Sequence, residues 1–114
     1  MKIAILHTSL DVTGGAEKQV LNLAIELQNK GHDVNVYVSK IDPTKCYPNL
    51  VKKVNIIECA GFGYKHHRLS IITSLYYMWK MSQIVGDCDV INCHNYPTLY
   101  AAVKLKKRIG KPIV

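Results

Sequence analysis

The sequence predicts an α/β protein built on a doubly wound, Rossmann-like parallel sheet. Short apolar runs alternate with longer segments in which apolar residues recur every three or four positions, which is the pattern of strands alternating with helices. The first run, Lys2–His7, is almost wholly apolar, which is typical of a strand buried on both faces. The connection Gly31-His32 is short, as expected for a βαβ unit with a right-handed crossover.

The segment after the first strand contains a glycine pair and a long amphipathic helix. Thr8–Thr13 is polar and expected to be irregular, and Gly14-Gly15 follows it. Ala16–Lys30 is expected to be helical, because one stripe of it is apolar: Val20, Leu23, Ala24 and Leu27. Gly31 is expected to end this helix in the left-handed conformation.

The remaining elements continue the alternation. Strands are expected over Asp33–Ser39, Val54–Cys59 and Asp89–Cys93, and helices over Ser70–Val85 and Thr98–Ile109. The second of these helices is expected to end at Gly110, and Asp42–Pro48 is expected to be a loop. In the helix Ser70–Val85, the apolar residues expected to pack are Ile71, Leu75, Met78, Trp79 and Ile84. In the helix Thr98–Ile109 they are Leu99, Ala102, Val103 and Leu105.

The last residues, Lys111–Val114, begin a further strand. Strands usually run about 5–6 residues. We therefore expect the chain to be a piece of a longer polypeptide, with a sheet of order 3-2-1-4-5 that is incomplete at the C-terminus.

Length and composition indicate one globular domain. A chain of 114 residues, 48% hydrophobic and 20% charged, has enough apolar content for a core and is unlike a disordered chain. Lys and Arg exceed Asp and Glu by 15 to 8, for a formal charge of +7. Such an excess favours anionic partners such as phosphates, acidic lipid surfaces or nucleic acid. Charge alone does not distinguish these partners from a solvated basic face.

The cysteines and the N-terminus indicate a cytoplasmic protein. The four cysteines show no Cys-x-x-Cys spacing, and a chain with this much core needs no disulfide framework, so we expect reduced thiols. The N-terminus lacks the layout of a signal peptide. The longest apolar stretch, Leu69–Val85, is interrupted by polar residues and is too short for a membrane span.

The strand order brings two distant segments to one edge of the sheet. In the order 3-2-1-4-5 the first and fourth strands are neighbours, and ligands bind in the crevice at their carboxyl ends. Gly14 and Gly15 follow the first strand, and His94 follows the fourth. Glycines let a ligand approach the backbone, and the helix start behind them suits an anion, most often phosphate. We therefore predict a ligand site at this edge, with a plain tight turn as the alternative for the glycine pair.

Several ionisable residues flank that predicted site. His94 offers an imidazole that titrates near neutrality and can bond a substrate hydroxyl or carry a proton, or else makes a loop hydrogen bond. His7, at the end of the first strand, is expected to be structural. Glu17 either contacts a ligand or stabilises the helix start, and Lys18 meets either a phosphate or water.

Other kinds of site receive less support. We expect no metal site, because adjacent His66 and His67 do not readily chelate one ion and no Cys-x-x-Cys or i, i+4 histidine pair exists. We expect no nucleic-acid site, because the basic residues are scattered and form no recognised motif. The segment Tyr64–Trp79 mixes cations with aromatic residues and suits peripheral docking on an anionic membrane. A partly buried helix after a solvated basic loop is the favoured interpretation of that segment.

The chain resembles the N-terminal domain of the retaining glycosyltransferases of family 4, which have the GT-B fold. The resemblance lies in the strand Lys2–His7 and in Gly14-Gly15-Ala16-Glu17-Lys18 with its helix and the exit Gly31-His32-Asp33-Val34. It continues in Asp89-Val90-Ile91-Asn92-Cys93-His94 and in Gly110-Lys111-Pro112-Ile113-Val114. The stretch Asp42–Tyr77 is generic.

This resemblance implies an architecture and a reaction. Residues 1–114 are then the N-terminal portion of a GT-B Rossmann-like domain, which forms the acceptor side of a cleft. The other side is implied to be a nucleotide-sugar-binding domain of the same polypeptide, which is absent from this sequence. The whole protein is implied to transfer a sugar from a nucleotide-sugar co-substrate to a saccharide or lipid-linked acceptor, without a metal or other cofactor. The family's Glu-x7-Glu pattern has no counterpart here, so this portion alone is expected to be inactive.

The resemblance also implies roles for individual residues. Gly14 and Gly15, with Ala16, Glu17 and Lys18 beside them, are implied to lie against the donor diphosphate or an acceptor phosphate. His94 matches the family's cleft histidine near the transferred sugar and is the candidate catalytic residue.

One alternative from another class stays open: a non-catalytic binding module, which is either a small nucleotide or phosphate binder or one subunit of a split transferase. An NAD-binding domain is disfavoured, because the third glycine of G-x-G-x-x-G is absent and Ser39 and Lys40 stand where an acidic residue would end the second strand.

Overall fold

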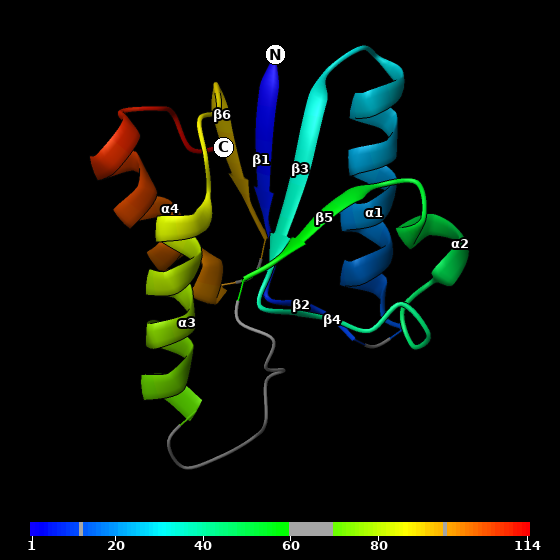
Figure 1. Ribbon diagram of the computed structural model, residues 1–114, viewed down its shortest axis with the longest axis horizontal. Helices are drawn as coiled ribbons and strands as arrows, with labels where there is room; N and C mark the ends of the chain where they lie inside the picture. Colours follow the sequence, from blue (N-terminus) through cyan, green and yellow to red (C-terminus); the bar gives the residue numbers. More distant parts are fainter. Residues whose placement is uncertain (12, 60–69, 95) are drawn as a thin grey trace.

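The computed structural model describes residues 1–11, 13–59, 70–94 and 96–114 of the chain (Figure 1). Strands and helices follow one another in this order: β1 (Lys2–Leu6), β2 (Ser9–Leu10), α1 (Gly15–Asn29), β3 (Asp33–Val38), β4 (Lys40–Ile41), α2 (Pro48–Val51), β5 (Asn55–Glu58), α3 (Ser70–Ile84), β6 (Val90–Cys93) and α4 (Tyr96–Ile109).

The main sheet has the predicted order. Its four strands run β5-β3-β1-β6, and every neighbouring pair is parallel. Beyond β6, Ile113 forms a parallel bridge with Ile91, and the Val114 N–H donates to the Ile91 carbonyl at 2.8 Å. The four strands confirm the 3-2-1-4 part of the predicted order, and the bridge at Ile113 lies where the fifth strand is expected, next to β6.

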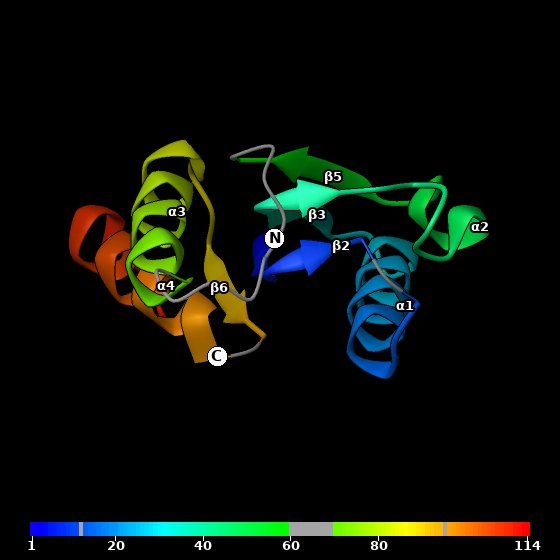
Figure 2. The same ribbon diagram turned by 90° about the horizontal axis from the view of Figure 1, so that it is seen from below.

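Helices cover both faces of the sheet, as Figures 1 and 2 show: α1 and α2 lie on one side, and α3 and α4 lie on the other. Alternate residues of β1 enter the two cores. Ile3 and Ile5 belong to the core with α1, whereas Ala4 and Leu6 belong to the core with α3 and α4. Because both faces of β1 are buried, its sequence is continuously apolar.

Two glycines end helices as predicted. Gly31 after α1 has φ 91° and Gly110 after α4 has φ 69°, which are left-handed conformations that other residues rarely adopt. The Gly31 N–H donates to the Gln28 carbonyl at 3.0 Å, and the Gly110 N–H donates to the Lys106 carbonyl at 2.8 Å. Each glycine therefore satisfies a carbonyl of the last helical turn.

The segment Thr8–Thr13, which was expected to be irregular, contributes one strand of a second, small sheet. Beyond the main sheet the chain pairs again: β2 lies parallel to β4, with Ser9 opposite Lys40 and Leu10 opposite Ile41. Leu10 is fully buried, which explains why an apolar residue stands in this polar segment. The short helix α2 begins at Pro48, which is the last residue of the expected loop Asp42–Pro48.

The packing faces of α3 and α4 differ from those predicted. Met78 is buried as expected, but Leu75, Trp79 and Ile84 are 40–47% exposed. Among the side chains described, Met81 and Ser82 of α3 are also buried, as is Val85, which follows the helix. In α4, Ala102 and Leu105 are buried as expected, whereas Leu99 and Val103 are exposed. Each helix packs on both the sheet and the other helix, and this contact selects the buried stripe. The side chain of Ile71 and the segment Tyr64–Leu69 lie outside the described residues.

All four cysteines are free thiols, as expected; Cys46, Cys59 and Cys88 are buried and Cys93 is half-buried. Within the described ranges, no helix has the length and apolar content needed to cross a bilayer.

Candidate functional site

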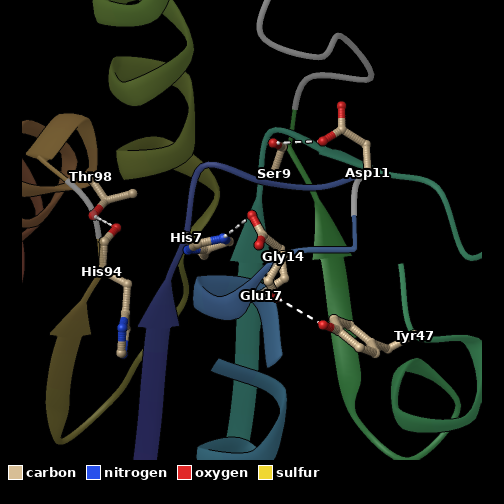
Figure 3. Close-up of polar contacts among 8 residues, drawn as sticks. All are labelled: His7, Ser9, Asp11, Gly14, Glu17, Tyr47, His94 and Thr98. Carbon is tan, nitrogen blue, oxygen red and sulfur yellow. Dashed lines mark hydrogen bonds and ion pairs between the residues drawn. The ribbon is translucent and has the colours of Figure 1, made fainter. Parts of the chain in front are cut away.

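The ends of β1 and β6 bring His7 and His94 together. The register pairs Leu6 with Cys93, and the next residue of each strand is a histidine. The His94 N–H donates to the Leu6 carbonyl at 2.9 Å, so the backbone ladder continues into this pair. The predicted neighbourhood of the first and fourth strands is therefore confirmed, and it places two imidazoles at the carboxyl edge of the sheet (Figure 3).

The glycine loop is held by a segment that follows β4. Gly14 is the residue before α1 and has an extended backbone, with φ −129° and ψ 170°. Its carbonyl accepts from the Lys18 N–H at 3.2 Å and from the Tyr47 hydroxyl at 3.1 Å. The Thr13 hydroxyl donates to the Lys45 carbonyl at 2.7 Å. These contacts fix the start of α1 relative to the sheet.

The two glycines have different surroundings. A Cβ built on Gly14 would overlap the Glu17 carboxylate, whereas a Cβ built on Gly15 meets no atom within 4 Å. Gly15 is exposed, as are Ala16 and Lys18 in the same helical turn. Only Gly15 therefore leaves open space in front of the helix start.

Glu17 connects the glycine loop with His7. It is the third residue of α1, the position from which a capping-box glutamate folds back over the helix start. Its Oε1 lies 3.6 Å from His7 Nε2, and its side chain is only 14% exposed. Figure 3 shows the His7 ring directed at Glu17, with Gly14 beside the carboxylate.

The two imidazoles lie close together at this edge. Their ring centroids are 6.5 Å apart, and the ring planes are inclined by 72°. Burial lowers the pKa of His94. The pKa of His7 is lowered mainly by burial and further by His94, while the nearby Glu17 carboxylate opposes that shift. Both rings are therefore held toward the neutral form.

His94 carries an unused hydrogen-bonding atom. Its Nε2 is buried and has no hydrogen-bond partner in the part of the chain that the structure describes. Its carbonyl accepts from the Thr98 hydroxyl at 2.5 Å, which ties the end of β6 to α4. In Figure 3 the His7 side chain lies between His94 and Glu17, so His7 rather than His94 faces the glycine loop.

Sequence reasoning found part of this cluster. It singled out Gly14, Gly15, Glu17 and His94, which the structure places along one edge. His7, which is expected to be structural, is fully buried and contacts both Glu17 and His94. The available signal was positional: His7 and His94 each follow the apolar run of a strand, and those two strands were predicted to be neighbours.

The cluster suits hydrogen bonding and proton transfer. A neutral imidazole both accepts and donates, which fits a substrate hydroxyl. Within the described ranges, no three His, Cys, Asp or Glu side chains are grouped so as to hold a metal ion. Burial, together with the Glu17 and Asp11 carboxylates, raises the pKa of the nearby Cys46 thiol to about 11, so this thiol is not a nucleophile at neutral pH.

Comparison with known proteins identifies similar sequences and folds. Residues 13–114 match the sequence profile of Glycosyltransferase Family 4. The alpha-1,3/1,6-mannosyltransferase ALG2 of Kluyveromyces lactis is 32% identical over 87 residues, covering 70% of this chain and 17% of that protein. This chain therefore spans less than a fifth of the length of that relative.

Solved structures share the fold at low identity. The apo form of the lipopolysaccharide outer core galactosyltransferase WaaB matches with a TM-score of 0.71 and 18% identity, over 97% of this chain and 31% of that one. The C-terminal domain of PF1911 hydrogenase from Pyrococcus furiosus matches with a TM-score of 0.69 and 16% identity, over 99% of this chain and 88% of that one. A galactosyltransferase and a hydrogenase domain share this fold, so the fold does not by itself select an activity.

Proposed function

This chain belongs to Glycosyltransferase Family 4, and we propose that it forms the acceptor-side wall of the cleft in a retaining transferase. The reaction is the transfer of a sugar from a nucleotide-sugar to a saccharide or lipid-linked acceptor. The second wall, which binds the nucleotide-sugar, comes from a C-terminal domain of the same polypeptide. The observation that carries this proposal is the buried, unpartnered Nε2 of His94, among the described residues, at the edge where β1 and β6 meet the glycine loop.

The start of α1 supplies the phosphate contact in this proposal. The first N–H groups of a helix have no partner within it and lie at the positive end of its dipole. Gly15 has open space in front of it, and Lys18 is exposed in the same turn. A donor diphosphate or acceptor phosphate therefore reaches the backbone at Gly15 and Ala16, where the Lys18 ammonium adds its charge.

His94 is the catalytic residue in this proposal. Its Nε2 gains a hydrogen bond when a sugar hydroxyl enters, and that bond replaces no existing one among the described residues. Burial lowers the pKa of His94, so its ring is predominantly neutral near pH 7 and remains able to accept a proton.

Mannose is the first donor sugar to test. The relative from Kluyveromyces lactis is named an alpha-1,3/1,6-mannosyltransferase and covers 70% of this chain. A nucleotide-activated mannose, with a saccharide or lipid-linked acceptor, is therefore the first pair of substrates to test with the complete polypeptide.

Replacement of His94 tests the proposal. We expect His94→Ala in the complete polypeptide to lower kcat at least tenfold, which corresponds to about 1.4 kcal/mol, because the bond to the sugar is lost in the transition state. The measurement is transfer of radiolabelled mannose at saturating donor. His32→Ala is the matched control, since His32 precedes β3 at the opposite edge of the sheet and should leave kcat unchanged. Equal turnover in both variants would exclude His94 from the reaction.

We also propose that α3 and α4 contact an anionic membrane surface, which keeps the transferase peripheral and cytoplasmic. The exposed aromatic rings of Tyr76 and Trp79 on α3 lie 6.2 Å apart, and Tyr100 on α4 is exposed with the Lys104 ammonium over its ring. Neither helix contains Asp or Glu, and together they carry five cations: Lys80, Lys104, Lys106, Lys107 and Arg108. Exposed aromatic rings among cations suit the headgroup region of an acidic bilayer.

A further inference from the structure

We propose that Glu17 is a positioning residue whose carboxylate occupies the space that Gly14 leaves open and there holds the His7 imidazole beside His94. The two glycines then serve different partners: Gly14 receives Glu17, and Gly15 receives the ligand. The inference rests on the proposed function in one respect, namely that His94 acts in sugar transfer.

The backbone of Gly14 does not itself require glycine. Its φ of −129° and ψ of 170° are extended angles that any residue adopts. A Cβ on Gly14 would overlap Glu17 Oε2, so a side chain at position 14 would have to displace this flexible carboxylate from its place beside His7. The glycine at position 14 therefore leaves room for the chain's own carboxylate in the position that contacts His7.

The other carboxylate oxygen faces a fully buried ring. Glu17 Oε1 lies 3.6 Å from His7 Nε2, and His7 is 0% exposed. Attraction between a largely buried carboxylate and an imidazole N–H is stronger than it would be in water. Two titratable neighbours among the described residues act on the pKa of His7: Glu17 on α1 and His94 after β6.

His7 transmits this restraint to His94. Hydrogen bonds with the strands on either side fix the two backbones: His7 N–H donates to the Tyr37 carbonyl at 3.0 Å, and His94 N–H to the Leu6 carbonyl at 2.9 Å. These backbone bonds do not set the side-chain torsions, and the two rings meet edge to face at 6.5 Å. A His7 ring held by Glu17 therefore limits the positions open to the His94 ring.

The loop is expected to persist when Glu17 is replaced. The Tyr47 hydroxyl holds the Gly14 carbonyl at 3.1 Å, and Thr13 holds the Lys45 carbonyl at 2.7 Å, both independently of Glu17. Variants at position 17 therefore test the carboxylate and leave the loop backbone in place.

A double-mutant cycle in the complete polypeptide tests the pairing of Gly14 with Glu17. Urea unfolding is measured for Gly14→Ala, Glu17→Ala and the double variant. We expect each single variant to lower the unfolding midpoint and the double variant to be no lower than Glu17→Ala alone, because the methyl group added at position 14 then has no carboxylate to displace. The matched cycle with Gly15→Ala should be additive. Additive effects of Gly14→Ala and Glu17→Ala would overturn the proposal.

Histidine titration by NMR supplies a readout that a purely structural role would not change. With ¹³Cε1-labelled histidine, Glu17→Gln should lower the pKa of His7, because the variant removes the carboxylate that opposes the shift caused by burial. Glu26→Gln, an exposed position on the same helix, is the control and should leave that pKa unchanged. An unchanged His7 titration in Glu17→Gln would also overturn the proposal.

Kinetics separate the two glycines. We expect Glu17→Gln and Gly14→Ala to lower kcat at least threefold with the donor KM retained, and Gly15→Ala to raise the KM of the phosphate-bearing substrate. The unfolding and titration results need no substrate. If they hold while the polypeptide transfers no sugar, the proposed function fails and the assignment of Glu17 stands. An unchanged kcat in an active polypeptide overturns the positioning role.

Discussion

Two imidazoles share one edge of the sheet with the Glu17 carboxylate, and this arrangement sets their chemistry. A protonated histidine shielded from water is costly, which is why burial lowers the pKa of both His7 and His94. A second positive charge 6.5 Å away adds to that cost. Glu17 offsets part of it at His7 alone. The cluster is therefore suited to work at neutral pH with His94 as an acceptor.

The lowered pKa values predict how stability depends on pH. Both histidines have folded pKa values below the unfolded value of 6.5, so the unfolded chain binds more protons as the pH falls through this range. The contribution of these two histidines to the free energy of unfolding is therefore fully present above pH 6.5. It is lost as the pH falls toward their pKa values in the folded protein. We expect the melting temperature to decrease from pH 7.5 to pH 5.5, and to decrease less in His94→Gln.

Two comparisons make this measurement specific. His32→Gln, at the opposite edge of the sheet, should retain the full pH dependence; the same loss of slope in both variants would contradict the assignment. Asp42 and Asp89 also have lowered pKa values, through hydrogen bonds from Thr44 and from the Lys2 N–H. Their contribution is lost only as the pH falls below their unfolded value of 3.8, which is outside the measured range.

At the scale of the elements, the glycines that end α1 and α4 are open to a matched test. Gly31 and Gly110 have positive φ, so an alanine at either position is strained whatever space surrounds it. We expect Gly31→Ala and Gly110→Ala each to lower the free energy of unfolding by about 1–2 kcal/mol. Gly86→Ala is the control, because Gly86 has equally open surroundings without a positive φ. Urea unfolding measures all three, and an equal loss in Gly86→Ala would contradict the strain argument.

The elements that sequence predicted are those marked by local signals. Short runs rich in apolar residues, one of them alternating with polar residues, predicted the four strands of the main sheet, and Gly31 and Gly110 marked two helix ends. The small sheet of β2 and β4 was missed, because two-residue strands carry no periodicity. The packing face of α3 was wrong at Trp79 and Ile84, because its neighbour α4 selects the buried stripe and its sequence is apolar on more than one face.

The candidate site was also predictable only in part, namely in which residues share one edge of the sheet. The strand order alone placed Gly14, Gly15 and His94 at one edge. The contact between Glu17 and His7 depends on how one side chain folds back over Gly14, and no sequence period encodes such a conformer. The assignment of His94 to the reaction stays a prediction, as do the ligand contacts of the glycine loop.

At the scale of the whole molecule, sequence and fold carry different information. The profile match over residues 13–114 assigns the family, whereas the fold is shared with proteins titled galactosyltransferase and hydrogenase. The relative from Kluyveromyces lactis is far longer than this chain. Sugar transfer therefore stays a proposal for a longer polypeptide, whereas the surfaces of the given chain can be tested by what they bind.

The exposed rings and cations of α3 and α4 predict binding to acidic lipid. Trp79 is the single tryptophan of this chain and is 47% exposed, so it reports its own transfer from water into the headgroup region. We expect its fluorescence to shift to the blue with vesicles of equal parts phosphatidylglycerol and phosphatidylcholine, and not with phosphatidylcholine alone. The shift should weaken at high salt, which screens the cations. Trp79→Phe identifies the signal if other tryptophans exist in the complete polypeptide.

Charge variants decide whether these two helices make the contact. Each lysine near an acidic surface contributes about 1 kcal/mol, so Lys104→Ala and Lys107→Ala should each weaken partitioning roughly fivefold in a vesicle sedimentation measurement. Lys53→Ala is the matched control, since Lys53 is equally charged and exposed but follows α2, which lies on the other side of the sheet in Figure 1. If Lys53→Ala weakened binding as much as Lys104→Ala, attraction by net charge alone would explain the binding. If neutral vesicles bound as strongly as acidic ones, the cations of α4 would have no part in it.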